Sequence, residues 1–268
     1  MIGHAIGSVF AAARDALARG LIALGVVPNV LTVLGAAAMA AAAVCYALGS
    51  GGRFAWSLEG GDVPSAWLLL AGGLLTFAFA CDMLDGAVAR LAGSKTEFGA
   101  FLDSTLDRFS DFAVYAGIAI YYAWSAPKAN VTFVLLSMVA FFNAYMISYT
   151  RARAEDIIDR CGVGFWQRGE RSAAILVATF AHNIPALVVQ QAILPALTVW
   201  RRISYTRAAI GQKRTGAGPQ EGGFANRLRI WRQPRGTIRY DITAAANIAW
   251  LIFAPVRDAD VLRNWLAF

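Results

Sequence analysis

The sequence contains repeated apolar stretches of about 20 residues, and this feature limits most strongly what the chain can fold into. A helix of about 20 apolar residues crosses the hydrocarbon core of a bilayer. We expect six membrane-spanning helices, over residues 28–48, 65–91, 97–124, 131–155, 171–182 and 184–203. The pattern therefore predicts an all-α integral membrane protein.

The composition argues against several other classes of protein. Apolar residues make up 58% of the 268 residues and charged residues 15%, whereas a soluble domain is about half apolar and about a quarter charged. Cys45, Cys81 and Cys161 lack the spacing of a disulfide framework or a zinc site. His4 and His182 are too few for a site built on histidines.

Charge divides the chain into three segments. Residues 1–24 mix apolar and charged side chains and predict an amphipathic helix in the membrane interface. Residues 25–205 form the predicted six-helix transmembrane domain. Residues 206–268 form a basic extension, since residues 201–240 hold ten Lys or Arg against Glu221 alone. We expect this extension to contact anionic lipid headgroups and not nucleic acid.

The distribution of Lys and Arg predicts the orientation in the cell membrane. Between the expected helices, one side holds only Arg53 and Lys128, and the other basic residues share the side of the N-terminus. The positive-inside rule then places both termini in the cytoplasm.

In the extension, residues 211–223 predict a flexible linker. Residues 242–255 are apolar but short, which favours a surface-lying or packed helix.

Two pairs of aspartates occur where the second expected helix ends and the third begins. Asp82 and Asp85 are spaced i,i+3, and Asp103 and Asp107 are spaced i,i+4, so each pair lies on one helix face. Antiparallel neighbouring helices would bring the pairs to the same depth, near the cytoplasmic face. Four ionised carboxylates repel one another unless cations lie among them. Two Mg²⁺ or Mn²⁺ ions would balance them.

The neighbouring residues favour chemistry at phosphorus. Two-metal sites stabilise the attacking and leaving oxygens of a displacement at phosphorus. Gly86 and Gly99 leave room for close approach, and Arg90 offers a guanidinium to a phosphate. A phosphoryl-transfer enzyme is the function that these residues predict.

The sequence resembles the CDP-alcohol phosphotransferase family, whose signature it matches at every defined position, Asp82-x2-Asp85-Gly86-x2-Ala89-Arg90-x8-Gly99-x3-Asp103-x3-Asp107. The resemblance covers roughly residues 10–205 and implies the interfacial helix, the six spans and a homodimer. It also implies that the four aspartates hold the ions and that Asp107 is the catalytic base. The residues implied to contact the CDP-lipid are Asn29, Val30, Leu31, Thr32, Gly86, Arg90 and Thr96.

Two further segments, residues 147–155 and 167–171, resemble the branch that makes phosphatidylinositol phosphate from CDP-diacylglycerol and inositol phosphate. That branch commonly has Lys at position 151 and Pro at position 169, where this chain has Arg151 and Gly169. A cluster of arginines suits an anionic acceptor, because each guanidinium can bind a phosphate through two hydrogen bonds. We expect the acceptor's phosphate to bind Arg151, Arg153, Arg168 and Arg171.

Alternatives remain at this point. A phosphatidylglycerophosphate synthase would use glycerol 3-phosphate, which is also an anionic acceptor. A cation transporter could use aspartates within the membrane, although its acidic groups should lie near mid-bilayer. The basic extension could also be an interaction module attached to an enzyme.

Overall fold

The computed structural model describes residues 2–51, 64–215 and 237–256, and all secondary structure in these ranges is helical. The chain divides into two compact units, the first ending at residue 129 and the second starting at residue 130. The helices of the first unit are α1 (Ile2–Ala23), α2 (Pro28–Gly49), α3 (Ala66–Leu91) and α4 (Glu97–Ile120), which continues into the π-helical turn η1 (Tyr121–Ser125).

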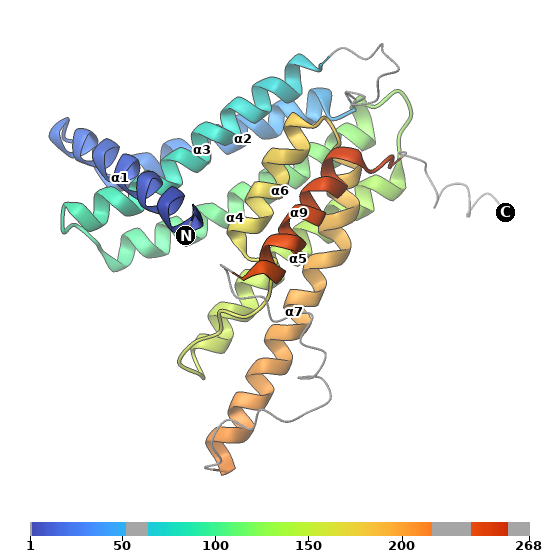
Figure 1. The fold of residues 1–268 in the computed structure, drawn as a ribbon. Helices are drawn as coiled ribbons and strands as arrows, with labels where there is room; N and C mark the ends of the chain where they lie inside the picture. Colours follow the sequence, from blue (N-terminus) through green and yellow to red (C-terminus); the bar gives the residue numbers. More distant parts are fainter. Residues whose placement is uncertain (1, 52–63, 216–236, 257–268) are drawn as a thin grey trace. The chain divides into compact units, whose positions relative to one another are not determined.

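In the first unit, α2 packs along both α3 and α4 (Figure 1). Glycines allow these close contacts. A Cβ on Gly35 would lie 3.2 Å from Cys81 Cβ on α3, and a Cβ on Gly117 would overlap the carbonyl oxygen of Ala43. Small residues let helix backbones approach closely where lipid gives little hydrophobic driving force. Helix α1 packs on α3, where Ala18 is fully buried.

A tight turn joins α3 to α4. Gly93 has a φ of 64°, a conformation that favours glycine, and it follows the end of α3. The amide of Ser94 donates to Ala89 O at 3.1 Å and closes the turn. Thr96 then caps α4, because its Oγ1 accepts a hydrogen bond from the Gly99 amide at 2.9 Å. The turn brings the start of α4 back beside the end of α3.

The second unit contains α5 (Val131–Glu155), α6 (Arg168–Phe180), α7 (Ile184–Thr215) and α9 (Ile238–Phe253). His182 has a φ of 54° and stands between α6 and α7. Helix α7 contains Pro195 and continues to Thr215, beyond the expected end at residue 203. Residues 211–215 of the expected linker are therefore helical. The rest of that linker, and much of the basic extension, lie outside the described residues.

Helix α9, the red helix in Figure 1, packs against α6 and α7. Near its start, Tyr240 Oη donates to Glu170 Oε1 at 2.8 Å, and at its end Ala254 O accepts from Asn183 Nδ2 at 3.0 Å. In between, Gln190 Nε2 donates to Asn247 Oδ1 at 3.0 Å. These pairs make α9 parallel to α6 and antiparallel to α7, so the short apolar segment forms a packed helix.

Four of the described helical segments are long and apolar enough to cross a membrane, Pro28–Gly49, Ala66–Leu91, Val131–Glu155 and Ile184–Gly211. The other two expected spans are helical but differ in character. Helix α4 carries charged residues in its N-terminal part, and α6 has only 13 residues. At 1.5 Å per residue, α6 is about 20 Å long, against about 30 Å for the hydrocarbon core.

Candidate metal and substrate sites

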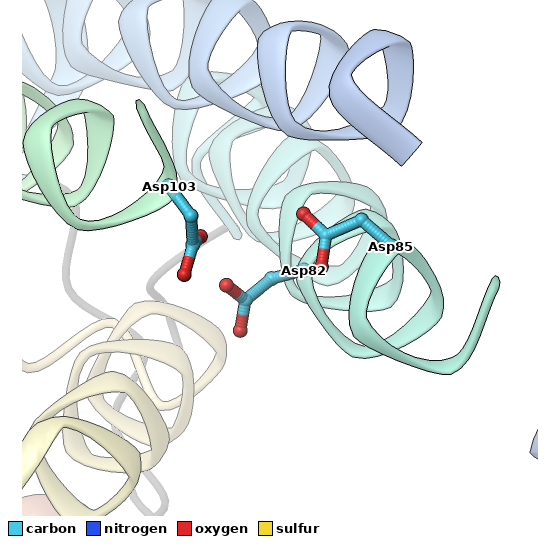
Figure 2. A group of neighbouring side chains, drawn as sticks. All are labelled: Asp82, Asp85 and Asp103. Carbon is cyan, nitrogen blue, oxygen red and sulfur yellow. The ribbon is translucent and has the colours of Figure 1, made fainter. Parts of the chain in front are cut away.

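Three of the predicted metal ligands converge in the first unit. Asp82 and Asp85 extend from α3 and Asp103 from α4, toward a common space (Figure 2). One carboxylate oxygen from each lies within 4.8 Å of the others. The side chain of Asp85 is the most enclosed of the three, at 8% exposure. The α3 face that carries Asp82 and Asp85 therefore meets Asp103 on α4.

Asp107 is not part of this group of three. It lies one helical turn beyond Asp103 on α4, where its Cα is displaced by about 6 Å along the helix axis. The structure thus brings together three of the four aspartates that the sequence singles out.

The donor set fits a hard divalent cation. Three carboxylates so close together repel one another as anions, and a cation among them removes that cost. All three offer oxygen ligands, which suit Mg²⁺, Mn²⁺ or Ca²⁺ better than soft metals. The cysteines of the described residues are free and buried. The geometry supports a metal site formed by α3 and α4.

The start of α2 borders this acidic cluster. Thr32 Oγ1 lies 2.7 Å from Asp85 Oδ2 and 3.2 Å from Pro28 O. A hydroxyl has one proton to donate, and a carboxylate is a stronger acceptor than a carbonyl. The Thr32 proton therefore goes to Asp85. This hydrogen bond joins the segment expected to contact CDP to a candidate metal ligand.

Other residues predicted to contact the CDP-lipid surround the same region. A Cβ on Gly99 would lie 3.0 Å from Thr96 Oγ1 and 3.3 Å from Asn29 Oδ1, so these two side chains flank the glycine. A Cβ on Gly86 would lie 3.5 Å from Arg90 Nη1, so the Arg90 guanidinium folds back over Gly86. The glycines leave the space that a larger residue would fill.

Two neighbouring residues of the predicted CDP-lipid set, Val30 and Leu31, differ in burial. Leu31 is 7% exposed and packs with Ala18 and Cys81 in the core formed by α1, α2 and α3. Val30 is 50% exposed. Leu31 therefore supports the position of the α2 start through packing.

In the second unit, arginines gather around a buried guanidinium that the sequence analysis did not single out. Arg171 and Arg202 are each 2% exposed. Arg202 Nε donates to Val163 O at 3.2 Å, and its Nη1 donates to Ile147 O. The charges of Arg151 and Arg171 act on Arg202. The Glu155 carboxylate also acts on Arg202 and offsets part of this positive charge. Arg202 follows Arg201 at the end of the sixth expected span. This position is the one sequence feature that could have indicated a role for Arg202.

The other predicted acceptor arginines differ in their surroundings. Arg151 pairs with Glu155 and Arg153 with Asp156, each at 3.1 Å on the surface. Arg153 lines a cavity of about 370 Å³ between α5 and α7, together with Arg207 and Ile210. Arg168 is the first residue of α6 and is half-buried. The charges of Arg151 and Arg171 therefore act on Arg202, and Arg153 lines the same cavity as Arg202.

Known proteins resemble this chain over most of its length. The model of the CDP-alcohol phosphatidyltransferase family matches residues 25–208. The phosphatidylinositol phosphate synthase of Mycobacterium tuberculosis is 33% identical over 178 residues, which are 66% of this chain and 74% of the relative. The archaetidylinositol phosphate synthase of Pyrococcus horikoshii is 32% identical over 190 residues, 70% of this chain and 88% of the relative.

Solved structures agree with these sequence matches. The crystal structure of the M. tuberculosis phosphatidylinositol phosphate synthase with CDP-DAG bound has a TM-score of 0.59 and 30% sequence identity, over 72% of this chain and 92% of that one. The same enzyme in complex with manganese and citrate also has a TM-score of 0.59, over 72% of this chain and 88% of that one.

Proposed function

Because the chain belongs to the CDP-alcohol phosphatidyltransferase family, we propose that it transfers the phosphatidyl group of CDP-diacylglycerol to a hydroxyl of inositol phosphate. The products are phosphatidylinositol phosphate and CMP. One observation carries this proposal: the carboxylates of Asp82, Asp85 and Asp103 converge beside the start of α2. The synthases among the relatives support inositol phosphate as the acceptor.

We propose that two divalent ions, Mg²⁺ or Mn²⁺, bind at Asp82, Asp85, Asp103 and Asp107. The manganese complex of the related synthase supports a metal at such a site. When bound, the ions neutralise the diphosphate and stabilise the charge that develops on the departing CMP. The cluster of carboxylates at the α3–α4 turn supports this assignment.

The protein residues bind the CDP-lipid and move one proton. Asn29, Thr32, Gly86, Arg90 and Thr96 contact the CDP moiety, and the main chain at residues 30–31 contributes to the same segment. The acceptor oxygen attacks the lipid-side phosphorus, and the bond from that phosphorus to the CMP oxygen breaks. Asp107 accepts the proton that the acceptor hydroxyl loses, as a general base.

The arginines of the second unit bind the phosphate of the acceptor. We assign Arg151, Arg168 and Arg171 to this role and add Arg202, whose burial supports it. An anionic acceptor compensates the buried positive charge, whereas free inositol or serine would not. Arg153 is less suited to bind the acceptor's phosphate, because it is exposed and paired with Asp156.

An acceptor assay tests this function. The purified chain is given CDP-diacylglycerol and Mn²⁺ with inositol 1-phosphate, glycerol 3-phosphate, free inositol or serine, and released CMP is measured. We expect the fastest release with inositol 1-phosphate and none after chelation of the metal. Preference for glycerol 3-phosphate would instead identify a phosphatidylglycerophosphate synthase, and a cation transporter would release no CMP.

The membrane arrangement follows from helix order and charge. We propose that α2 to α7 provide six spans, that α1 lies in the interface, and that the protein is a homodimer in the cell membrane. The N-terminus and the arginines at the start of α6 face the cytoplasm, by the positive-inside rule.

Helix α9 packs beside α6 and bears on the membrane arrangement. It starts beside Glu170 and ends beside Asn183, so it runs in the same direction as α6. Its outward-facing residues include Ile242 and Phe253, which are 63% and 69% exposed. A helix side lined by exposed apolar side chains is suited to contact with lipid. We therefore propose that α9 is embedded beside α6 and that its C-terminal end, at Phe253, lies toward the outer face of the membrane.

A further inference from the structure

Helix α9 lies outside the residues that match the family, which end at residue 208. It nevertheless contacts the segment that carries two acceptor arginines, because Tyr240 Oη donates to Glu170 Oε1 at 2.8 Å. Glu170 stands between Arg168 and Arg171 in the first turn of α6. We propose that Tyr240 is a positioning residue that fixes this turn for binding of the acceptor's phosphate. The inference rests on the proposed function.

The Tyr240 side chain is held on the α9 side. The Oγ1 of Thr237 caps α9 and accepts a hydrogen bond from the Tyr240 amide at 3.3 Å. The Tyr240 ring packs on Phe165, with 5.3 Å between ring centroids. Its backbone, ring and hydroxyl are thus each in contact with a defined partner. A side chain held in this way loses little further entropy when it hydrogen-bonds Glu170.

The segment before α6 is held from the α7 side as well. The Trp166 amide donates to Thr198 Oγ1 at 3.2 Å, and Val163 O accepts from Arg202. Both of these hydrogen bonds lie before α6 begins. In the first turn of α6, Tyr240 of α9 hydrogen-bonds Glu170. The two helices therefore secure successive parts of one segment.

The residues of the first turn of α6 give a reason why this turn requires such a contact. Gly169 is its second residue, and glycine has the largest conformational freedom to lose in a helix. Arg171 is 2% exposed, so its guanidinium has little room to compensate for a displaced backbone. A shift of the turn would move Arg168 and Arg171 relative to Arg202. Weaker binding of the acceptor, with unchanged binding of the CDP-lipid, is the expected consequence.

Steady-state kinetics of the full-length Tyr240→Phe variant test the inference. This change removes the hydroxyl and retains the ring that packs on Phe165. With the anionic acceptor that the wild-type chain prefers, we expect the acceptor KM to rise about tenfold, the effect of losing one hydrogen bond to a charged group. The kcat and the KM for CDP-diacylglycerol should stay within about twofold of wild type, since neither depends on this turn.

Two further variants complete the experiment. Tyr205→Phe makes the same chemical change at an exposed position of α7 and should leave all three constants unchanged. In a Glu170→Ala background, Tyr240→Phe should add less than about a twofold effect, because coupled residues are not additive. The inference would be overturned by an unchanged acceptor KM, by additive effects of the two substitutions, or by an equal rise in the KM of both substrates. Absence of CMP release by the wild type would instead overturn the proposed function.

Discussion

Thr32 on α2 donates a hydrogen bond to Asp85 on α3, with 2.7 Å between Oγ1 and Oδ2. Asp85 is 8% exposed and shares the acidic cluster with Asp82 and Asp103. A partner that donates to a metal-binding carboxylate fixes the direction in which its oxygens point. The segment proposed to contact CDP thereby also orients a proposed metal ligand.

Replacing Thr32 by valine should weaken metal binding. Valine keeps the shape of threonine but cannot donate to Asp85. Loss of such a supporting contact costs about 10- to 100-fold in metal affinity or activity. We expect the Mn²⁺ concentration for half-maximal CMP release, at saturating CDP-diacylglycerol, to rise by about tenfold. Thr76→Val is the control, because Thr76 Oγ1 donates to Gly72 O of its own helix. Equal Mn²⁺ dependence in both variants would contradict the proposed role of Thr32.

Replacing Asp103 or Asp107 by asparagine should abolish most activity. Asparagine keeps the size but removes the charge. We expect CMP release to fall by roughly 100-fold or more in each variant. Titration calorimetry with Mn²⁺ should show fewer bound ions than the two expected for the wild-type chain. Asp15→Asn is the control, since Asp15 pairs with Arg14 on the surface of α1. Full activity in the Asp103 and Asp107 variants would refute the assignment.

Arg202→Lys should raise the KM for the acceptor. Lysine has a single ammonium and cannot reproduce a guanidinium that donates to both Val163 O and Ile147 O. We expect about a tenfold rise in the acceptor KM, because guanidinium–phosphate pairs are strong and geometrically specific. Arg160→Lys makes the same change at an exposed residue and should have no effect. If both variants keep the wild-type KM, Arg202 has no part in acceptor binding.

Cysteine labelling should reveal the direction of α9. Arg239→Cys and Pro255→Cys place thiols beside the two ends of this helix, and the native cysteines are buried. With an impermeant maleimide, we expect Pro255→Cys to react in intact cells and Arg239→Cys only in inside-out vesicles. Lys128→Cys and Arg160→Cys serve as references for the proposed outer and cytoplasmic faces. Labelling of both ends of α9 from one side would show that the helix does not cross.

Gly117→Ala should destabilise the first unit. The added Cβ would overlap the carbonyl oxygen of Ala43, so α2 and α4 would have to separate. Overpacking of this kind costs about 1–3 kcal/mol. Gly73→Ala is the matched control, because its Cβ would meet no atom within 4 Å. It should be neutral or stabilising by about 0.5–1 kcal/mol, the difference between glycine and alanine in a helix. Thermal denaturation in detergent compares the two, and a Gly117 variant as stable as wild type would contradict the packing.

The sequence by itself determined the helical class and singled out the four aspartates, three of which form the acidic cluster. These properties are local in sequence. The length of an apolar segment determines whether it can form a helix that crosses lipid. Spacings of three and four residues place Asp82 with Asp85, and Asp103 with Asp107, on one face of a helix. The turn at Gly93 then joins the two faces. The family signature lies in this same local segment.

Only the tertiary structure decided which distant side chains meet. Thr32 and Asp85 are 53 residues apart, and Tyr240 and Glu170 are 70 apart. No spacing rule connects such positions, because their contact depends on how whole helices pack. The burial of Arg202 and the direction of α9 are also results of packing between helices. The sequence thus specified the chemical groups, and the packing of the helices selected their partners.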